Sequence, residues 1–211
     1  MIINHDDTRY RKKWHSMNNN KYNGAFFYSK EICKYMIPNV KTTRNWITIN
    51  ADVGLDHSIV FIHNNLHPEN YNYLKDYKDL ILVCGVEETQ DKVRHLGTPI
   101  YLPLSVKVDD VAKYKTKKTR DTAYVGRRPK RDKLRFPSGT DYIENLPRTK
   151  LLGLMAQYQK IYAVGRTAIE GLILDCEILP YDTRYPDVTR WKILDTLDAA
   201  EILQQKLNEV D

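Results

Sequence analysis

The sequence predicts an α/β protein built from two small Rossmann-like domains, and three observations lead to this prediction. Short apolar, β-branched runs alternate with segments of helical periodicity along the chain. Most of the runs end in glycine or polar residues, and ligands of open parallel sheets bind at the carboxyl ends of strands. A lysine-rich stretch interrupts the alternation once, near the middle of the 211 residues. We therefore expect domains at 1–110 and 119–211, joined by a polar linker.

The first half contains four short runs with the composition of strands. They are Trp-Ile-Thr-Ile, Ser-Ile-Val-Phe-Ile, Leu-Ile-Leu-Val and Pro-Ile-Tyr-Leu, at 46–49, 58–62, 80–83 and 99–102. Side chains of this kind pack well on a pleated sheet. Between the runs lie segments able to form helices, at 25–36, 68–78 and 87–95. This order is typical of a parallel sheet whose strands are joined by helices.

The second half repeats the pattern. Expected strands lie at 122–125, 160–164 and 177–181, and the first two are followed by Gly126 and Gly165. Apolar residues at helical spacing predict a helix over 151–158, another over 168–173 and a closing helix at about 188–209. These apolar stripes are expected to form the core of the second domain.

Composition places the chain among soluble globular proteins. It has a mass of 24.8 kDa and contains 42% apolar and 28% charged residues, which excludes long disorder and fibrous structure. The longest apolar runs are far too short to span a membrane, and the first residues carry charges without a signal-peptide core. Cys33, Cys84 and Cys176 show no metal-type spacing, so we expect reduced thiols and a cytoplasmic protein.

The net charge of +6 comes from one basic stretch. Residues 112–135 contain eleven Lys and Arg against two Asp, and without them the chain would be slightly acidic. Such a stretch attracts phosphate, in a nucleotide or along a nucleic acid. The alternative is a solvated interdomain linker, and we favour it for residues 113–120.

Gly126 opens the first of two glycine elements that could carry chemistry. It directly follows an expected strand and precedes Arg127, Arg128, Pro129 and Lys130. Backbone amides at a helix start, together with a planar guanidinium, would suit a diphosphate. The alternative is a strand-to-helix turn on a basic surface.

Gly165 opens the second element, which continues with Arg166 and Thr167 and reaches Glu170. Thr167 and Glu170 have the spacing of a capping box, in which each side chain bonds a backbone amide near the helix start. The alternative is functional, because an acidic side chain at this place can accept hydrogen bonds from the vicinal hydroxyls of a ribose.

Several common motifs are missing. The sequence has no dinucleotide fingerprint, no Walker lysine pattern, no Asp-x-Asp pair, no Gly-x-Ser-x-Gly and no His-Glu-x-x-His. His63 and His67 are four residues apart but lie beside Pro68, in a segment more typical of a loop than of a helix. We therefore predict no bound metal.

Five landmarks follow one another along the chain. They are Asn-Gly-Ala at 23–25, a strand over 56–64 that reaches His63, Ile-Tyr-Leu-Pro-Leu-Ser-Val-Lys-Val-Asp at 100–109, Tyr-Val-Gly-Arg at 124–127 with Lys130 or Lys133, and the segment 165–171 that contains Glu170. In this order and spacing they resemble GT-B-fold glycosyltransferases, particularly the large group-1 family. The resemblance covers most of the chain, and the compact, tyrosine- and lysine-rich sequence resembles glycosyltransferases encoded by bacteriophages.

The resemblance implies two Rossmann-like domains that face a cleft and a metal-independent reaction without a cofactor. A sugar would pass from a nucleotide diphosphate sugar to an acceptor hydroxyl, on a phage DNA base, a cell-surface molecule or a protein. The implied residues fall into four groups: Gly126, Arg127, Lys130 and Lys133 for the donor diphosphate, Gly165, Arg166, Thr167 and Glu170 for the donor ribose and nucleotide, Asn23, Gly24 and Asn64 on the acceptor side, and His63 as the candidate catalytic base.

The chain also departs from the family. It is shorter than most members, Tyr162 stands where the retaining branch has a second glutamate, and Asp-Thr-Arg at 182–184 replaces a glycine pair. Two alternatives therefore stay open, a nucleotide- or nucleotide-sugar-binding protein without catalysis, and a nucleic-acid-binding protein that uses its basic stretch.

Overall fold

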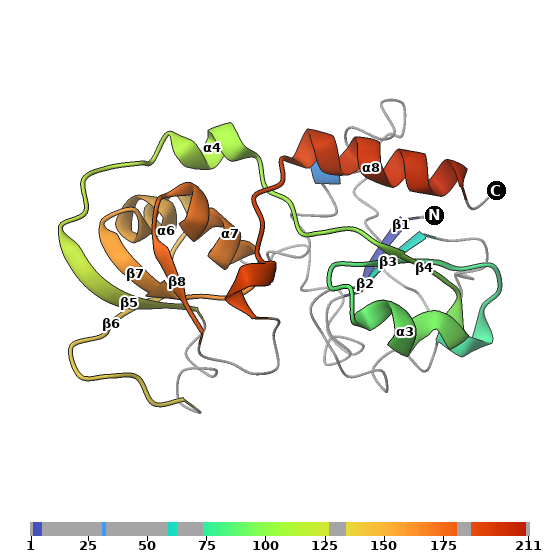
Figure 1. The fold of residues 1–211 in the computed structure, drawn as a ribbon, viewed down its shortest axis with the longest axis horizontal. Coiled ribbons are helices and arrows are strands. Elements are labelled where there is room, and N and C mark those ends of the chain that lie inside the picture. Colours follow the sequence, from blue (N-terminus) through green and yellow to red (C-terminus); the bar gives the residue numbers. More distant parts are fainter. Residues whose placement is uncertain are drawn as a thin grey trace. The chain divides into compact units, whose positions relative to one another are not determined.

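The computed structural model describes residues 2–5, 31–32, 59–62, 74–126, 134–180 and 187–209. The chain divides into two compact units, which are Met1–Leu104 with Leu197–Asp211 (unit 1) and Ser105–Thr196 (unit 2). Each unit contains a parallel sheet of four strands with helices between them, so the α/β prediction is confirmed (Figure 1). The unit boundaries differ from the expected ones, because residues 105–119 group with unit 2 and the closing helix, from Leu197, with unit 1.

The sheet of unit 1 follows the order of the sequence. Its strands are β1 (Ile2–His5), β2 (Ile59–Ile62), β3 (Ile81–Cys84) and β4 (Thr98–Tyr101), each parallel to the next. The last three confirm expected strands to within one residue at each end. The sequence did not predict β1, and the expected strand at 46–49 lies outside the described residues.

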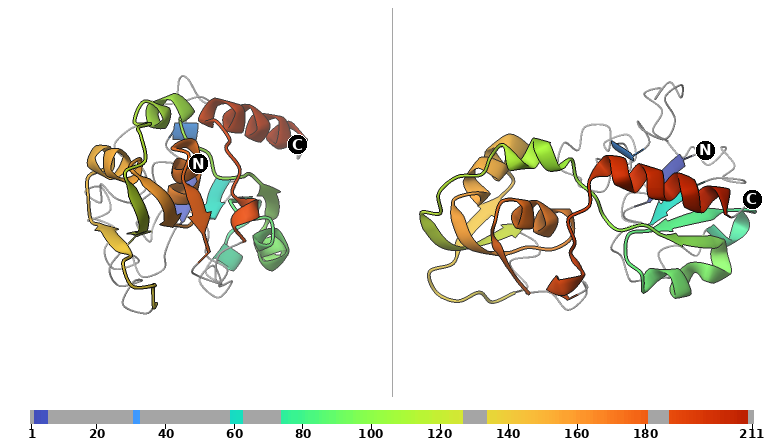
Figure 2. Two further views of the ribbon diagram at one scale, coloured as in Figure 1. Left: turned by 60° about the vertical axis from the view of Figure 1, so that its left-hand side comes forward. Right: turned by 45° about the horizontal axis from the view of Figure 1, so that its top comes forward.

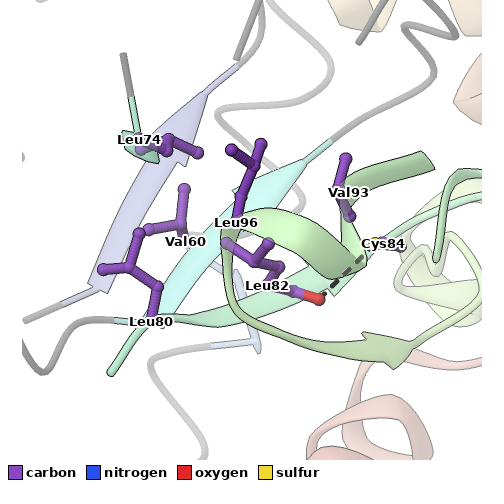
Figure 3. Close-up of a cluster of buried hydrophobic side chains, with 7 residues drawn as sticks. All are labelled: Val60, Leu74, Leu80, Leu82, Cys84, Val93 and Leu96. Carbon is purple, nitrogen blue, oxygen red and sulfur yellow. Dashed lines mark hydrogen bonds between the residues drawn. The ribbon is translucent and has the colours of Figure 1, made fainter. Parts of the chain in front are cut away.

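One face of this sheet carries a cluster of buried hydrophobic side chains. Helix α3 (Thr89–Val93) packs against β3 and β4. Together with the 3-10 turn η3 (Arg94–Leu96) that follows it, α3 confirms the helix expected at 87–95. Of the helices expected at 25–36 and 68–78, the described parts are helical at 31–32 and form a 3-10 turn at 74–76. The core side chains lie together in Figure 3 and are Val60, Leu74, Leu80, Leu82, Cys84, Val93 and Leu96.

The sheet of unit 2 does not follow the order of the sequence. Its strands are β5 (Arg120–Gly126), β6 (Asp141–Glu144), β7 (Tyr158–Tyr162) and β8 (Glu177–Leu179), in the spatial order β6-β5-β7-β8. Strands β5, β7 and β8 confirm the expected strands, although β7 begins and ends two residues earlier. The sequence did not predict β6, whose Asp-Tyr-Ile-Glu contains a single aliphatic residue.

Helices α6 (Arg148–Met155) and α7 (Arg166–Ile173) pack on one face of this sheet (Figures 1 and 2). Ala123, Ile161 and Ile178 form one register row across β5, β7 and β8 and are buried there. A Cβ atom on Gly171 of α7 would overlap the side chains of Ile161 and Ile178, so glycine lets the helix lie close to the sheet. Burying each isoleucine contributes about 2 kcal/mol.

The closing helix is shorter than expected. The sequence predicts one helix at about 188–209, but the structure has a 3-10 turn, η4 (Val188–Arg190), and then α8 (Thr196–Asn208). Between them Asp195 forms a parallel β-bridge with Val106, and its Oδ2 accepts a hydrogen bond from the backbone N–H of Val108, 3.0 Å away. Val108 is the first residue of α4 (Val108–Ala112), so the carboxylate of Asp195 caps the start of a helix that is distant in the sequence. The β-bridge with Val106 keeps the backbone of Asp195 extended.

Candidate functional site

The strand order of unit 2 reverses between β5 and β7. From β5 the chain passes to β6 on one side, and from β6 it returns across β5 to β7 on the other. In open α/β sheets ligands bind beyond the carboxyl ends of the two strands that flank such a reversal. These ends are Gly126 on β5 and, three residues after β7, Gly165. The strand order thus brings the two glycine elements to the same edge of one sheet, at its topological switch point.

Gly126 is required by the packing of its own strand. A Cβ atom there would overlap the hydroxyl and ring of Tyr124, two residues earlier on the same face. Tyr124 is fully buried, and its ring lies 4.8 Å from the ring of Phe136, so it has little room to move. The residues expected to hold a diphosphate after this glycine, Arg127, Lys130 and Lys133, lie outside the described residues.

Gly165 has a backbone conformation that other residues rarely adopt, with φ 62° and ψ −139°. It is the residue before the first turn of α7, which therefore begins at Arg166. The capping box suggested by Thr167 and Glu170 is not formed, because Thr167 is already inside the helix and no side chain caps this terminus. The interpretation of Glu170 as a capping residue is wrong.

The carboxylate of Glu170 instead holds two arginines. Its Oε1 accepts a hydrogen bond from Nε of Arg166 at 3.1 Å and lies 2.9 Å from a guanidinium nitrogen of Arg148, the first residue of α6. The side chains of Glu170 and Arg166 are 5% and 8% exposed, and that of Arg148 is 31% exposed. A buried carboxylate needs such partners, because removal from water strongly penalises its charge. The cluster joins the start of α7 to the start of α6, beside the switch point.

Nothing in the sequence indicated Arg148 as a residue of the candidate site. It follows Pro147, lies 22 residues before Glu170, and nothing in either local sequence links the two. Only the packing of α6 and α7 on one face of the sheet brings them together.

Tyr162 lies in an aromatic cluster at the end of β7. Tyr142, Tyr124 and Tyr162 form one register row across β6, β5 and β7, and Phe136 contacts all three rings at centroid distances of 6.1, 4.8 and 5.0 Å. This cluster was not predicted from the sequence, although each tyrosine could have been placed in it once the strands were paired. Pairing itself could not be deduced from the sequence, because β6 was not expected.

The first half of the basic stretch is structural. Nζ of Lys115 lies 2.8 Å from Oδ1 of Asp175, and Nζ of Lys118 donates hydrogen bonds to the carbonyl of Leu174 and to Sγ of Cys176. Leu174 follows the last turn of α7, where carbonyl groups lack partners within the helix and favour a cation. The seven residues of β5 separate these lysines from Gly126 by about 20 Å. They therefore lie at the amino end of the sheet, away from the switch point.

The site residues expected in the first half all lie outside the described residues. Asn23, Gly24, His63 and Asn64 are not among the described residues. Strand β2 ends at Ile62, directly before His63, so the histidine follows the carboxyl end of a strand as expected.

Within the described ranges, no group of three or more His, Cys, Asp and Glu could hold a metal ion. In the same part of the chain, no helix combines the length and the apolar character needed to cross a membrane. Comparison of the chain with protein families, curated proteins and solved structures finds no match.

Proposed function

We propose that the protein is a metal-independent glycosyltransferase that binds a nucleotide diphosphate sugar on unit 2. The observation that carries the proposal is the reversal of strand order between β5 and β7, which puts Gly126 and Gly165 at one edge of the sheet. Both glycines belong to segments that resemble the donor site of GT-B-fold enzymes. A topological switch point is the usual place for a nucleotide in sheets of this kind.

In this proposal the donor is held by charge and by hydrogen bonds. Arg127, with Lys130 or Lys133, binds the diphosphate and stabilises the negative charge that develops as the nucleotide leaves. Glu170 accepts hydrogen bonds from the ribose hydroxyls, while Arg148 and Arg166 fix the orientation of its carboxylate. Binding ribose through a preoriented carboxylate needs no rearrangement of the side chain.

The acceptor belongs to unit 1 in the same proposal. His63, directly after β2, would take the proton of the attacking hydroxyl, and Asn23, Gly24 and Asn64 would contact the acceptor. An imidazole is suited to this step because its ordinary pKa lies near neutral pH.

A second candidate is a protein that binds the nucleotide sugar without turning it over. The observation that favours it is the position of Tyr162, where retaining relatives carry a glutamate. Its ring packs 5.0 Å from that of Phe136 and belongs to the aromatic cluster. A tyrosine in that place brings no carboxylate to the reacting sugar.

The test combines thermal stability with turnover. The purified protein is mixed with a panel of nucleoside diphosphates and their sugar derivatives, and release of the nucleotide is measured. We expect one sugar nucleotide to raise the melting temperature and to be consumed. The variant Arg127→Ala should lose roughly 100-fold or more in turnover. The control Lys117→Ala removes an exposed cation near the amino end of β5 and should keep full turnover.

Three outcomes separate the candidates. Consumption that depends on Arg127 supports the transferase, and stabilisation without consumption supports the binding protein. If no nucleotide stabilises the protein, both candidates are wrong.

A further inference from the structure

The start of α6 lies at the same edge of the unit 2 sheet as the two glycine elements. Gly126, the last residue of β5, is paired in register with Glu144, the last residue of β6. The chain then turns at Asn145, which has a φ of 55°, and reaches Arg148, the first residue of α6. Because the carboxyl ends of parallel strands meet at one edge, Arg148 belongs to the edge that contains the topological switch point.

Arg148 is the member of its cluster with Arg166 and Glu170 that a ligand reaches first. Its side chain is 31% exposed, whereas those of Glu170 and Arg166 are 5% and 8% exposed. A ligand that approaches from solvent therefore meets the guanidinium of Arg148 before the carboxylate of Glu170. Glu144 follows the buried Ile143 on β6, so its side chain points to the face of the sheet opposite α6 and α7. The cluster thus presents a cation to the ligand.

The chemistry of Arg148 favours an oxyanion, and a phosphate in particular. A guanidinium carries five N–H donors in a planar fork, so it can hold a carboxylate on one side and phosphate oxygens on another. It also remains charged throughout the physiological pH range. The starts of α6 and α7 add to this charge, because both eight-residue helices begin at an arginine of the cluster and neither has a side-chain cap. Backbone amides of a first helical turn carry partial positive charge.

We propose that Arg148 is a further binding residue of the switch point and that it holds a phosphate of the bound ligand. The identification of this phosphate as part of a nucleotide diphosphate sugar rests on the proposed function. Arg148 then has two contacts, one to Glu170 and one to the ligand. It therefore fixes the position of the phosphate relative to the carboxylate that would bind the ribose.

The experiment measures binding of inorganic pyrophosphate to the full chain by isothermal titration calorimetry at constant ionic strength. Pyrophosphate has the charge and the oxygen atoms of a diphosphate but no base, ribose or sugar. We expect saturable binding, which Arg148→Gln should weaken roughly tenfold or more. Arg148→Lys keeps the charge without the planar fork and should have an intermediate affinity. The control Arg120→Gln removes an arginine that is also ion-paired, 3.5 Å from Asp141, but begins β5 at the opposite edge of the sheet, and it should leave binding unchanged.

Glu170→Gln separates a binding role of Arg148 from a structural one. It breaks the same ion pair as Arg148→Gln, so a purely structural role predicts that both variants bind pyrophosphate more weakly. Our proposal predicts opposite changes, because glutamine removes a negative charge that lies 2.9 Å from the guanidinium. Glu170→Gln should therefore bind pyrophosphate several-fold more tightly than the natural protein. Circular dichroism checks that each variant is folded, and if Glu170→Gln is not, higher affinity in Arg148→Lys than in Arg148→Gln is the result that the proposal requires.

Pyrophosphate affinity that is unchanged in Arg148→Gln, or that falls equally in Arg148→Gln and Glu170→Gln, would overturn the proposal. Competition connects the site to the donor, because the nucleoside diphosphate that most raises the melting temperature should displace pyrophosphate. If Arg148 holds pyrophosphate but no nucleotide binds, the proposed transferase is wrong and the phosphate site stands. If a sugar nucleotide is consumed while Arg148→Gln binds pyrophosphate normally, the transferase stands and the role of Arg148 is wrong.

Discussion

Replacing Glu170 by glutamine should lower the free energy of unfolding of unit 2 more than any comparable change on its surface does. The substitution keeps the shape of the side chain but leaves Arg166, 8% exposed, without the carboxylate that lies 3.1 Å from its Nε. It also removes the partner that lies 2.9 Å from Arg148. Removing one member of a buried ion pair typically costs 3–5 kcal/mol, and the partial exposure of Arg148 puts our expectation at about 3 kcal/mol. That is a large share of the 5–15 kcal/mol that stabilises a typical domain.

The assay is urea unfolding at pH 7 followed by far-ultraviolet circular dichroism. The matched control is Glu177→Gln, which breaks an exposed pair with Lys160 at 3.7 Å and should cost less than about 1 kcal/mol. The double variant Arg148→Gln with Glu170→Gln should be more stable than the sum of the two single changes predicts, because the two groups interact directly. If Glu170→Gln is no more harmful than Glu177→Gln, the carboxylate does not hold α6 and α7 together and our account of the cluster is wrong.

Further predictions concern packing, titration and hydrogen bonding in the described residues. Gly153→Ala should stabilise α6 by about 0.5–1 kcal/mol, since the nearest atom to a new Cβ is 3.9 Å away, whereas Gly171→Ala should destabilise by about 1–3 kcal/mol through overlap with the sheet. Thermal melts of the two alanine variants check both signs, and a Gly171→Ala variant as stable as the natural protein would contradict the packing described for α7. Burial raises the pKa of the Cys84 thiol from 9.0 to about 12. The contribution of this thiol to the free energy of unfolding is therefore complete below pH 9 and is lost as the pH rises toward 12. The free energy of unfolding should fall over that window, and it should fall less in Cys84→Ala. Tyr158→Phe should cost about 1–2 kcal/mol, because the hydroxyl of Tyr158 donates to Oδ2 of Asp141 at 2.8 Å and accepts a hydrogen bond from Nη1 of Arg120 at 3.1 Å. A Tyr158→Phe melting temperature equal to that of the natural protein would exclude a stabilising role for those hydrogen bonds.

The elements that sequence analysis predicted correctly are those whose signal is local. Val60 and its neighbours on β2, and Leu82 on β3, lie in dense aliphatic runs that have few alternatives to a buried strand. Strand β6 carries no such signal, because Asp141 and Glu144 enclose only one tyrosine and one isoleucine. It is a strand because β5 offers it a neighbouring edge, and that edge exists only after folding.

The closing helix shows how a distant contact overrides a local pattern. Its apolar stripe continues upstream of Thr196, so the sequence predicted a longer helix. Asp195 instead pairs with Val106, 89 residues earlier in the chain, and caps α4 through Val108. No periodicity within the segment could reveal that requirement.

In the candidate site, too, some features follow from local patterns and others from contacts between distant residues. The sequence alone identified Gly126 and Gly165 as glycines that follow strands, because a short apolar run followed by glycine is a local pattern. In the structure Gly126 is the last residue of β5, and Gly165 lies three residues after the end of β7. It also singled out Glu170, but assigned its carboxylate either to a cap or to a ligand, and the partner found in the structure, Arg148, was in neither interpretation.

What the sequence by itself determined is the class of the protein: an α/β chain of alternating elements with a basic stretch and two strands that are followed by glycine. The tertiary structure alone decided the order β6-β5-β7-β8, which brings both glycines to one edge of the sheet, and the burial of Glu170 between two arginines. The physical reason is that periodicity and turn residues act over a few positions. Strand order and ion pairing depend instead on which surfaces the folded chain brings into contact, across tens of residues.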